Sequence, residues 1–160
     1  MRLLIVSDTH RDYNSLNNAL MAQPHAEVII HLGDGADDVD LIKPKYPNKM
    51  FIQVKGNCDF NSNLPLYKEF YIENKKFFIT HGHMYNAKFD INQMCMAARE
   101  KNSDILLFGH THFSFETYEE NLHIMNPGSL AGSNGTYGII DMKKNGIVKN
   151  IISINKPSKI

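Results

Sequence analysis

Five short polar clusters contain the residue types that could bind a metal ion or move a proton. They are Asp8-Thr9-His10, Gly33-Asp34, Gly56-Asn57-Cys58-Asp59, His81-Gly82-His83 and Gly109-His110-Thr111-His112. Imidazoles, carboxylates and an amide suit Mn²⁺, Fe, Zn²⁺ or Ni²⁺ better than a cysteine-rich structural zinc site would. One such cluster is weak evidence, because Asp and Gly pairs are common in turns. Five of them in one chain predict a metal centre.

Each cluster follows a short apolar run that is typical of a buried strand. The runs are residues 3–6, 28–32, 50–54, 77–80 and 105–108. Helices are expected over 13–23, after a cap at Asp12 or Asn14, and over 91–101, after a cap at Asp90. A strand, helix and strand in succession favour parallel pairing. Because parallel strands bring their carboxyl ends to one edge of a sheet, the clusters should meet there.

The C-terminal third has the alternating pattern of antiparallel strands. The alternating runs are residues 113–118, 122–125, 137–142 and 147–154, and Asn145-Gly146 predicts a two-residue hairpin turn. Parallel pairing early and hairpins late predict an α/β fold with two packed mixed β-sheets flanked by helices. We expect one domain over residues 1–160, with 156–160 as a loose tail.

The composition limits the classes of function. The chain has 160 residues, 42% of them hydrophobic, with 17 Lys and Arg against 17 Asp and Glu. A formal charge of zero gives no general attraction to nucleic acid, so no nucleic-acid partner is expected. Two cysteines cannot form a disulfide scaffold, and no apolar stretch is long enough to span a membrane. We therefore expect a cytoplasmic protein without a membrane partner.

The ordered clusters resemble the signature of the calcineurin-like metallophosphoesterase superfamily, which reads D-x-H, G-D, G-N-H-[DE], H and G-H-x-H. Four of the five blocks match in full, and the resemblance extends from Asp8 to the turn 126–129. The short chain, the Gly-Asn-Cys-Asp block and the Asn-Pro-Gly-Ser turn are similar to the small YfcE-like phosphodiesterase branch. That branch also includes a eukaryotic retromer scaffold subunit. The resemblance implies an αββα sandwich.

The resemblance also implies seven ligands for two divalent metal ions per chain. One ion would be held by Asp8, His10 and His112, the other by Asn57, His81 and His110, with Asp34 bridging both. Mn²⁺ is favoured, with Fe, Zn²⁺, Ni²⁺ or Mg²⁺ as alternatives. The implied reaction is hydrolysis of a small phosphate diester by in-line attack of a hydroxide that bridges the metals. Asp34, Asn57 and His81 would thus also be catalytic.

Cys58 departs from the family pattern. Many relatives have a His there, which protonates the leaving oxygen. The Cys58 thiol is either a proton donor in that role or a small apolar filler. If Cys58 is a filler, the proton would come from Asp59, His83 or metal-bound water.

Arg11 stands where close relatives commonly have Gly, and the segment 130–135 lacks a basic residue that relatives often carry. Arg11 therefore either binds a substrate phosphate or carboxylate, or is a solvated arginine paired with Asp12 or Asp38. His83 lies two residues after His81, so its side chain is expected to point in the same direction from that loop. It is expected to contact substrate or to orient a metal ligand.

The remaining polar and aromatic residues of interest are expected to be structural. His25, His31 and His123 are interpreted as structural histidines, and Asp37, Asp38 and Asp40 as a solvated loop. Phe113, Phe115 and Tyr118 are interpreted as core or as an intersubunit surface.

Three other functions compete with a phosphodiesterase. A phosphomonoesterase would use the same metals. A scaffold like the retromer subunit predicts eroded ligands, whereas all seven ligand positions hold competent side chains here. A nuclease of this superfamily would need a longer chain with a basic stripe. The expected partners are a small phosphate ester and further copies of the chain, as a dimer or tetramer.

Overall fold

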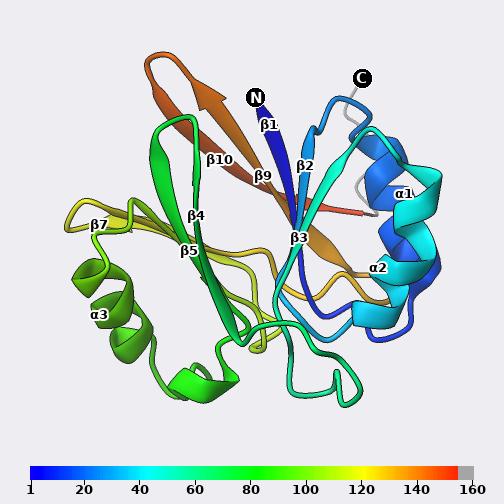
Figure 1. Cartoon of the computed structure of the whole chain (residues 1–160), viewed down its shortest axis with the longest axis horizontal. Helices are drawn as coiled ribbons and strands as arrows, with labels where there is room; N and C mark the ends of the chain where they lie inside the picture. The colour runs from blue at the N-terminus through cyan, green and yellow to red at the C-terminus, as the bar shows by residue number, and fades with distance from the viewer. Residues whose placement is uncertain (155–160) are drawn as a thin grey trace.

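The computed structural model describes residues 1–154, so the predicted tail at 156–160 lies outside the described residues. Figure 1 shows two β-sheets packed against each other with helices on both sides. The elements, in chain order, are β1 (Arg2–Val6), α1 (Tyr13–Ala22), β2 (Val28–His31), α2 (Ala36–Ile42), a 3₁₀ turn (Lys43–Lys45), β3 (Met50–Gln53), β4 (Tyr67–Ile72), β5 (Lys75–Thr80), a second 3₁₀ turn (His83–Tyr85), α3 (Asn92–Glu100), β6 (Ile105–Leu107), β7 (Phe115–Glu119), β8 (Leu122–Asn126), β9 (Thr136–Lys143) and β10 (Gly146–Ser153).

Each sheet has five strands and mixed pairing. The first sheet has the order β10-β9-β1-β2-β3, with β1, β2 and β3 parallel and β9 antiparallel to both β1 and β10. The second has the order β4-β5-β6-β8-β7, with β5, β6 and β8 parallel and the outer strands antiparallel. The predicted α/β fold of two packed mixed sheets flanked by helices is confirmed.

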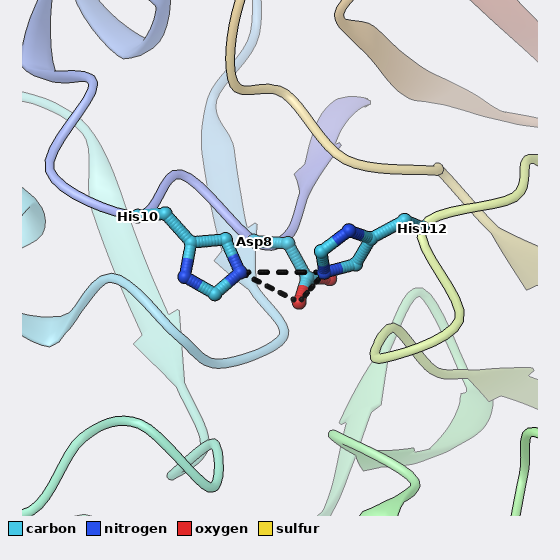
Figure 2. A group of neighbouring side chains, drawn as sticks. All are labelled: Asp8, His10 and His112. Carbon is cyan, nitrogen blue, oxygen red and sulfur yellow. Dashed lines mark hydrogen bonds and ion pairs between the residues drawn. The ribbon is translucent and has the colours of Figure 1, made fainter.

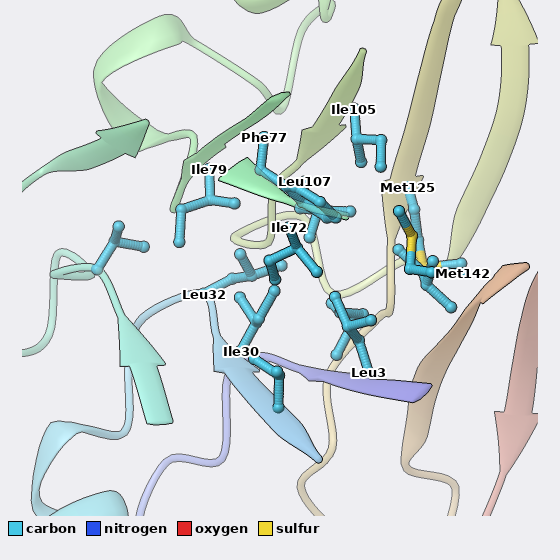
Figure 3. Close-up of a cluster of buried hydrophobic side chains, with 14 residues drawn as sticks. Leu3, Ile30, Leu32, Ile72, Phe77, Ile79, Ile105, Leu107, Met125 and Met142 are labelled. Carbon is cyan, nitrogen blue, oxygen red and sulfur yellow. The ribbon is translucent and has the colours of Figure 1, made fainter. Parts of the chain in front are cut away.

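Alternating apolar residues bury both faces of the central strands. On β1, Leu3 and Ile5 face the second sheet, where they join Phe77 and Leu107 in the cluster of Figure 3. Leu4 and Val6 of the same strand face α1 and α2 on the outer side. Helix α3 covers the outer face of the second sheet in the same way. Both faces of the central strands are therefore buried, which is why these strands have continuous apolar sequences.

Two elements were missed from the sequence. Strand β4 was missed because it is an edge strand with mostly exposed side chains. The second element is helix α2, where the sequence predicts a solvated loop, and that prediction is wrong. Asp37 and Asp40 are exposed on this helix, but Asp38 is only 3% exposed. A seven-residue helix with three carboxylates has too short an apolar pattern to be recognised.

Two smaller expectations are corrected at the C-terminal end. The hairpin between β9 and β10 turns at residues 144–145, one position before the predicted Asn145-Gly146, because Gly146 already pairs with Lys143. Phe113, Phe115 and Tyr118 are 80%, 40% and 57% exposed, so the core interpretation is wrong for all three. Within residues 1–154, no helix has both the length and the apolar character needed to cross a membrane.

Candidate metal centre

The five polar clusters meet at one end of the paired sheets, as the strand order predicts. Asp8 and His10 each donate a backbone N–H to the β2 loop, at Gly33 O and Asp34 O, both at 3.0 Å. In the second sheet, Gly109 N donates to His81 O at 3.1 Å. These bonds tie neighbouring loops together in both sheets, and the side chains of the two loop sets face each other.

Asp8 is fully buried and has one oxygen fixed and one oxygen free. Its Oδ2 accepts from Ser7 Oγ at 2.6 Å and from His110 N at 3.1 Å. Its Oδ1 accepts no hydrogen bond from the described residues. Figure 2 shows this oxygen aimed between His10 and His112, whose Nε2 atoms lie 3.6 and 3.2 Å from it. A buried carboxylate oxygen without a hydrogen bond is costly unless a cation lies beside it.

Asp34 is oriented in the same manner. Its Oδ1 accepts from Cys58 N at 2.7 Å, while its Oδ2 lies 3.3 Å from His81 Nε2 and 3.8 Å from His10 Nε2. Burial alone would raise the pKa of Asp34, but its hydrogen bond and charge interaction with His81 hold that pKa well below its usual range. Asp34 is thus an anion that faces histidines of both loop sets.

The Nε2 atom of His81 faces three oxygen atoms. Its Nδ1 lies 2.7 Å from Leu32 O, which can only accept, so the proton of the neutral ring is on Nδ1. Its Nε2 then faces Asn57 Oδ1 at 3.1 Å, Asp34 Oδ2 at 3.3 Å and Asp8 Oδ1 at 3.8 Å. Burial would lower the pKa of His81, but Asp34 and Asp8 raise it overall. The three oxygens favour a positive charge at this point, either a proton or a metal ion.

Three overlapping groups among the described residues could hold a metal ion. They are Asp8, His10 and His112; His10, Asp34 and Cys58; and Asp8, Asp34 and His81. Asn57 Oδ1 adjoins the third group through its contact with His81. The ring of His110 lies beside that of His81, with 5.0 Å between centroids, and burial lowers its pKa to about 4. The donor set therefore fits divalent ions, and Asn57 and His110 are the two predicted ligands that belong to none of these groups.

Backbone strain is concentrated at this site. Six non-glycine residues of the two loop sets have left-handed φ angles between 46° and 69°. They are Asp8, His10, Arg11, Asp34, His110 and His112. Such conformations cost of order 1–3 kcal/mol each and persist only where the surroundings enforce them. Gly33 permits the close approach, because a Cβ there would lie 2.7 Å from His81 Nδ1.

Asp59 organises the loop that carries Asp34. Its two carboxylate oxygens accept four backbone N–H groups, from Asp34, Gly35, Ala36 and Gly56, at 2.8 to 3.0 Å. Both oxygens are therefore committed to the backbone. This geometry favours a positioning role over the proton transfer considered from the sequence.

Cys58 and Arg11 lie at the open side of the site. Cys58 is exposed, so the interpretation as an apolar filler is wrong. Desolvation and the Asp34 charge raise the pKa of its thiol. The Arg11 side chain forms no ion pair within residues 1–154, although its backbone N donates to Asp38 Oδ2 at 3.0 Å. Arg11 lines the hollow beside His10 and Asp34.

A supporting network behind the loops was not identified from the sequence. Thr9 Oγ1 donates to Asp38 Oδ2 at 2.5 Å and contacts His31 Nε2 at 3.1 Å. Burial lowers the pKa of His31 to about 4, so this ring is neutral and structural. On the opposite side, Ser129 Oγ donates to Asp8 O at 2.9 Å, and Asn126 Nδ2 donates to Gly109 O at 3.0 Å. Single hydroxyls and amides of this kind give no spacing signal in a sequence.

The remaining histidines differ in position. His83 is half-buried, and its ring lies 5.4 Å from that of His81 and 6.1 Å from that of His110. Burial and the nearby His81 lower its pKa. His25 is exposed after α1, and the ring of His123 lies 4.4 Å from that of Tyr118, in a tilted arrangement, on the second sheet. Only His83 of the three lies beside the candidate centre.

Comparison with known proteins shows the family to which the chain belongs. The model of the calcineurin-like phosphoesterase superfamily domain matches residues 1–145, so the chain belongs to this superfamily. The phosphodiesterase YfcE of Escherichia coli K12 is 26% identical to it, over 100% of this chain and 96% of that protein. The resemblance noted from the sequence is confirmed.

Solved structures show the same fold. A predicted phosphoesterase from Streptococcus pneumoniae superposes with a TM-score of 0.81 at 22% identity, over 96% of this chain and 90% of that one. A wild-type Vps29 from Entamoeba histolytica, complexed with Zn²⁺, superposes with a TM-score of 0.72 at 19% identity, over 97% and 100%.

Proposed function

We propose that this chain is a metal-dependent phosphodiesterase that hydrolyses small phosphate diesters. The observation that carries the proposal is the buried, unpartnered Asp8 Oδ1, with the Nε2 atoms of His10, His81 and His112 at 3.2 to 3.8 Å. A buried carboxylate oxygen without a hydrogen bond is costly in free energy, and a cation bound between this oxygen and the three imidazoles would remove that cost. The site is therefore arranged for a metal ion, as in the family.

The donor set favours an anionic substrate. We assign Asp8, His10 and His112 to one ion, Asn57, His81 and His110 to the other, and Asp34 to both. When bound, two divalent ions, with Mn²⁺ favoured, supply the hydroxide nucleophile and the positive charge that holds the phosphate. Two carboxylates and a hydroxide leave roughly one net positive charge, because the imidazole and amide ligands are neutral.

The chain's own residues orient these groups. Asp34 is held through Cys58 N and the Asp59 loop, so that its free oxygen faces the centre. His81 is fixed in one tautomer by Leu32 O. Arg11 lines the hollow beside His10 and Asp34, and this position supports a role for Arg11 in binding a phosphate oxygen.

A scaffold without activity and a phosphomonoesterase are the alternatives. Metal binding alone does not separate an enzyme from a scaffold, because the Entamoeba Vps29 structure is itself a Zn²⁺ complex. The intact donor set favours an enzyme. Diester and monoester hydrolysis use the same metals, so only turnover separates them.

The deciding experiment compares bis(p-nitrophenyl) phosphate with p-nitrophenyl phosphate as substrates. Metal-stripped protein is assayed with and without Mn²⁺, with Asp34→Asn as the inactive control. Metal-dependent cleavage that favours the diester supports the proposal. Preference for the monoester would replace it with a phosphomonoesterase. Metal binding without cleavage of either ester would favour the scaffold.

A further inference from the structure

A groove leads away from the metal centre across the loop that follows β3. Its outer part is a cleft of about 440 Å³, and its inner part is a hollow of about 210 Å³ lined by His10 and Asp34. Both parts are lined by Arg11, Cys58 and Phe60, so they form one continuous groove. A diester whose phosphate lies at the metals would place one of its two organic arms in the outer cleft.

The groove contains charged residues of both signs. Arg11 lines both the hollow and the outer cleft, and its positive charge suits a phosphate oxygen. Asp37 lines both parts and Asp40 lines the outer cleft, both residues come from α2, and both are exposed. Three residues apart, they lie on the same helix face. Asp59 also lines the cleft, but its carboxylate accepts hydrogen bonds from four backbone N–H groups. An arm with negative charge would be repelled from the cleft, and one with positive charge attracted.

Phe60 supplies an aromatic surface at the same place. Its side chain is 82% exposed although it lines both parts of the groove. An exposed aromatic ring beside a cleft offers a flat apolar surface to a group bound in that cleft. Aromatic faces attract quaternary ammonium groups, and nearby carboxylates strengthen that attraction. A neutral nucleobase would also stack on Phe60, but it would not require two carboxylates beside the ring.

We propose that the substrates are phosphodiesters whose second arm ends in an ammonium group, such as choline or ethanolamine esters. Phe60, Asp37 and Asp40 contact this group, and Arg11 contacts the phosphate. This inference rests on the proposed phosphodiesterase activity. In the reaction, the oxygen of water bonds to phosphorus while the P–O bond to the leaving alcohol breaks. The two protons of water pass to the leaving oxygen and to the medium or the phosphate.

The experiment uses the Mn²⁺-loaded full chain and three diesters with the same p-nitrophenolate leaving group. The first is p-nitrophenyl phosphocholine, and the second is its neutral isostere with carbon in place of the ammonium nitrogen. The third is thymidine 5′-(p-nitrophenyl phosphate). We expect kcat/KM for the choline ester to exceed that of the isostere by about tenfold.

Three variants test which residues cause the preference for the choline ester. The double substitution Asp37→Asn with Asp40→Asn should bring the choline-to-isostere ratio of kcat/KM close to one. Phe60→Ala should lower the ratio by about threefold. Glu100→Gln removes an equal charge from the exposed surface of α3, outside the groove, and should leave the ratio unchanged. All four positions are exposed, so folding should be preserved.

Two kinds of result would overturn the inference, and they differ in whether the proposed phosphodiesterase function also fails. Equal rates for the choline ester and its isostere, or preference for the thymidine ester, would show that the groove does not select an ammonium group. The phosphodiesterase function would survive that result. If the wild-type chain cleaves none of the three esters, the proposed function itself fails, and the substrate assignment fails with it.

Discussion

The candidate metal centre has a buried floor and an exposed rim, and the two are built differently. The floor consists of Asp8, Asp34 and His81, whose exposed fractions are 0%, 3% and 0%. Each floor residue has a hydrogen bond on the atom that faces away from the centre. The rim includes His10 and His112, whose side chains are 33% and 50% exposed and whose Nε2 atoms lie 3.3 Å apart.

This difference separates two tasks. The floor provides the fixed geometry and buried negative charge, and His10 and His112 on the rim complete the donor set for a metal ion. Arg11 and Cys58, also on the open side, line the hollow together with His10. Substitutions of the floor residues or of the two rim histidines should therefore affect metal content and turnover together, whereas those at Arg11 and Cys58 should affect substrate binding or the last step of proton transfer.

The largest effect is expected from Asp34→Asn on the floor. Asparagine keeps the shape but removes the charge that faces both histidines, so we expect a loss of at least about a thousandfold in kcat. Metal content should fall below two ions per chain, as elemental analysis of the dialysed protein can measure. Asp37→Asn, an exposed carboxylate on α2, serves as the control and should keep full metal content. A variant that kept both ions and normal turnover would contradict the assignment of Asp34.

Asp59→Asn should weaken the floor indirectly. An amide has one acceptor oxygen and places its NH₂ group against N–H donors, so two of the four bonds are lost. We expect about 2 to 3 kcal/mol less free energy of unfolding and a ten- to hundredfold lower metal affinity. Chemical denaturation and Mn²⁺ titration measure these two quantities. If Asp59 were instead the proton donor, turnover would fall with metal affinity unchanged.

Acidification should weaken metal binding through the floor. Asp34 and Asp8 raise the pKa of His81, so its Nε2 keeps a proton at a higher pH than a free histidine does. A metal ion must displace this proton, so affinity should already decline near neutral pH, by about tenfold per pH unit below that pKa. The pKa of His110, at about 4, adds no competition until much lower pH. Calorimetric titrations with Mn²⁺ at pH 7.5 and 6.0, in two buffers, measure affinity and proton release. Equal affinity at both pH values would contradict this account.

On the rim, Arg11→Ala should raise KM by about tenfold with kcat changed less. The reason is that the Arg11 side chain lines the hollow beside the metal ligands and forms no ion pair within residues 1–154. Lys43→Ala, at the far end of α2, provides a control for the loss of one positive charge. An unchanged KM would show that Arg11 is a solvated surface residue that does not bind substrate.

The sequence predicted the floor better than its surroundings. Strong apolar runs located the strands, and parallel pairing required the polar clusters to meet at one edge. It could not predict the left-handed φ angles at Asp8 and Asp34, because tertiary contacts impose them against local preference. Nor could it predict the Thr9–Asp38 bond, because α2 itself was missed. The groove depends on which side chains remain exposed in a loop, and hydrophobic periodicity does not predict that exposure.

The smallest effect is expected from Cys58→Ala. Desolvation and the Asp34 charge raise the pKa of the thiol, so it is protonated near neutral pH and could in principle donate. A p-nitrophenolate leaves without needing a proton, so turnover of an aryl diester should fall by less than about tenfold. A diester with an alkyl leaving group does need the proton, so comparing the two esters shows whether the thiol donates it. Losses of several hundredfold on the aryl ester would show that the Cys58 thiol does more than protonate a leaving group.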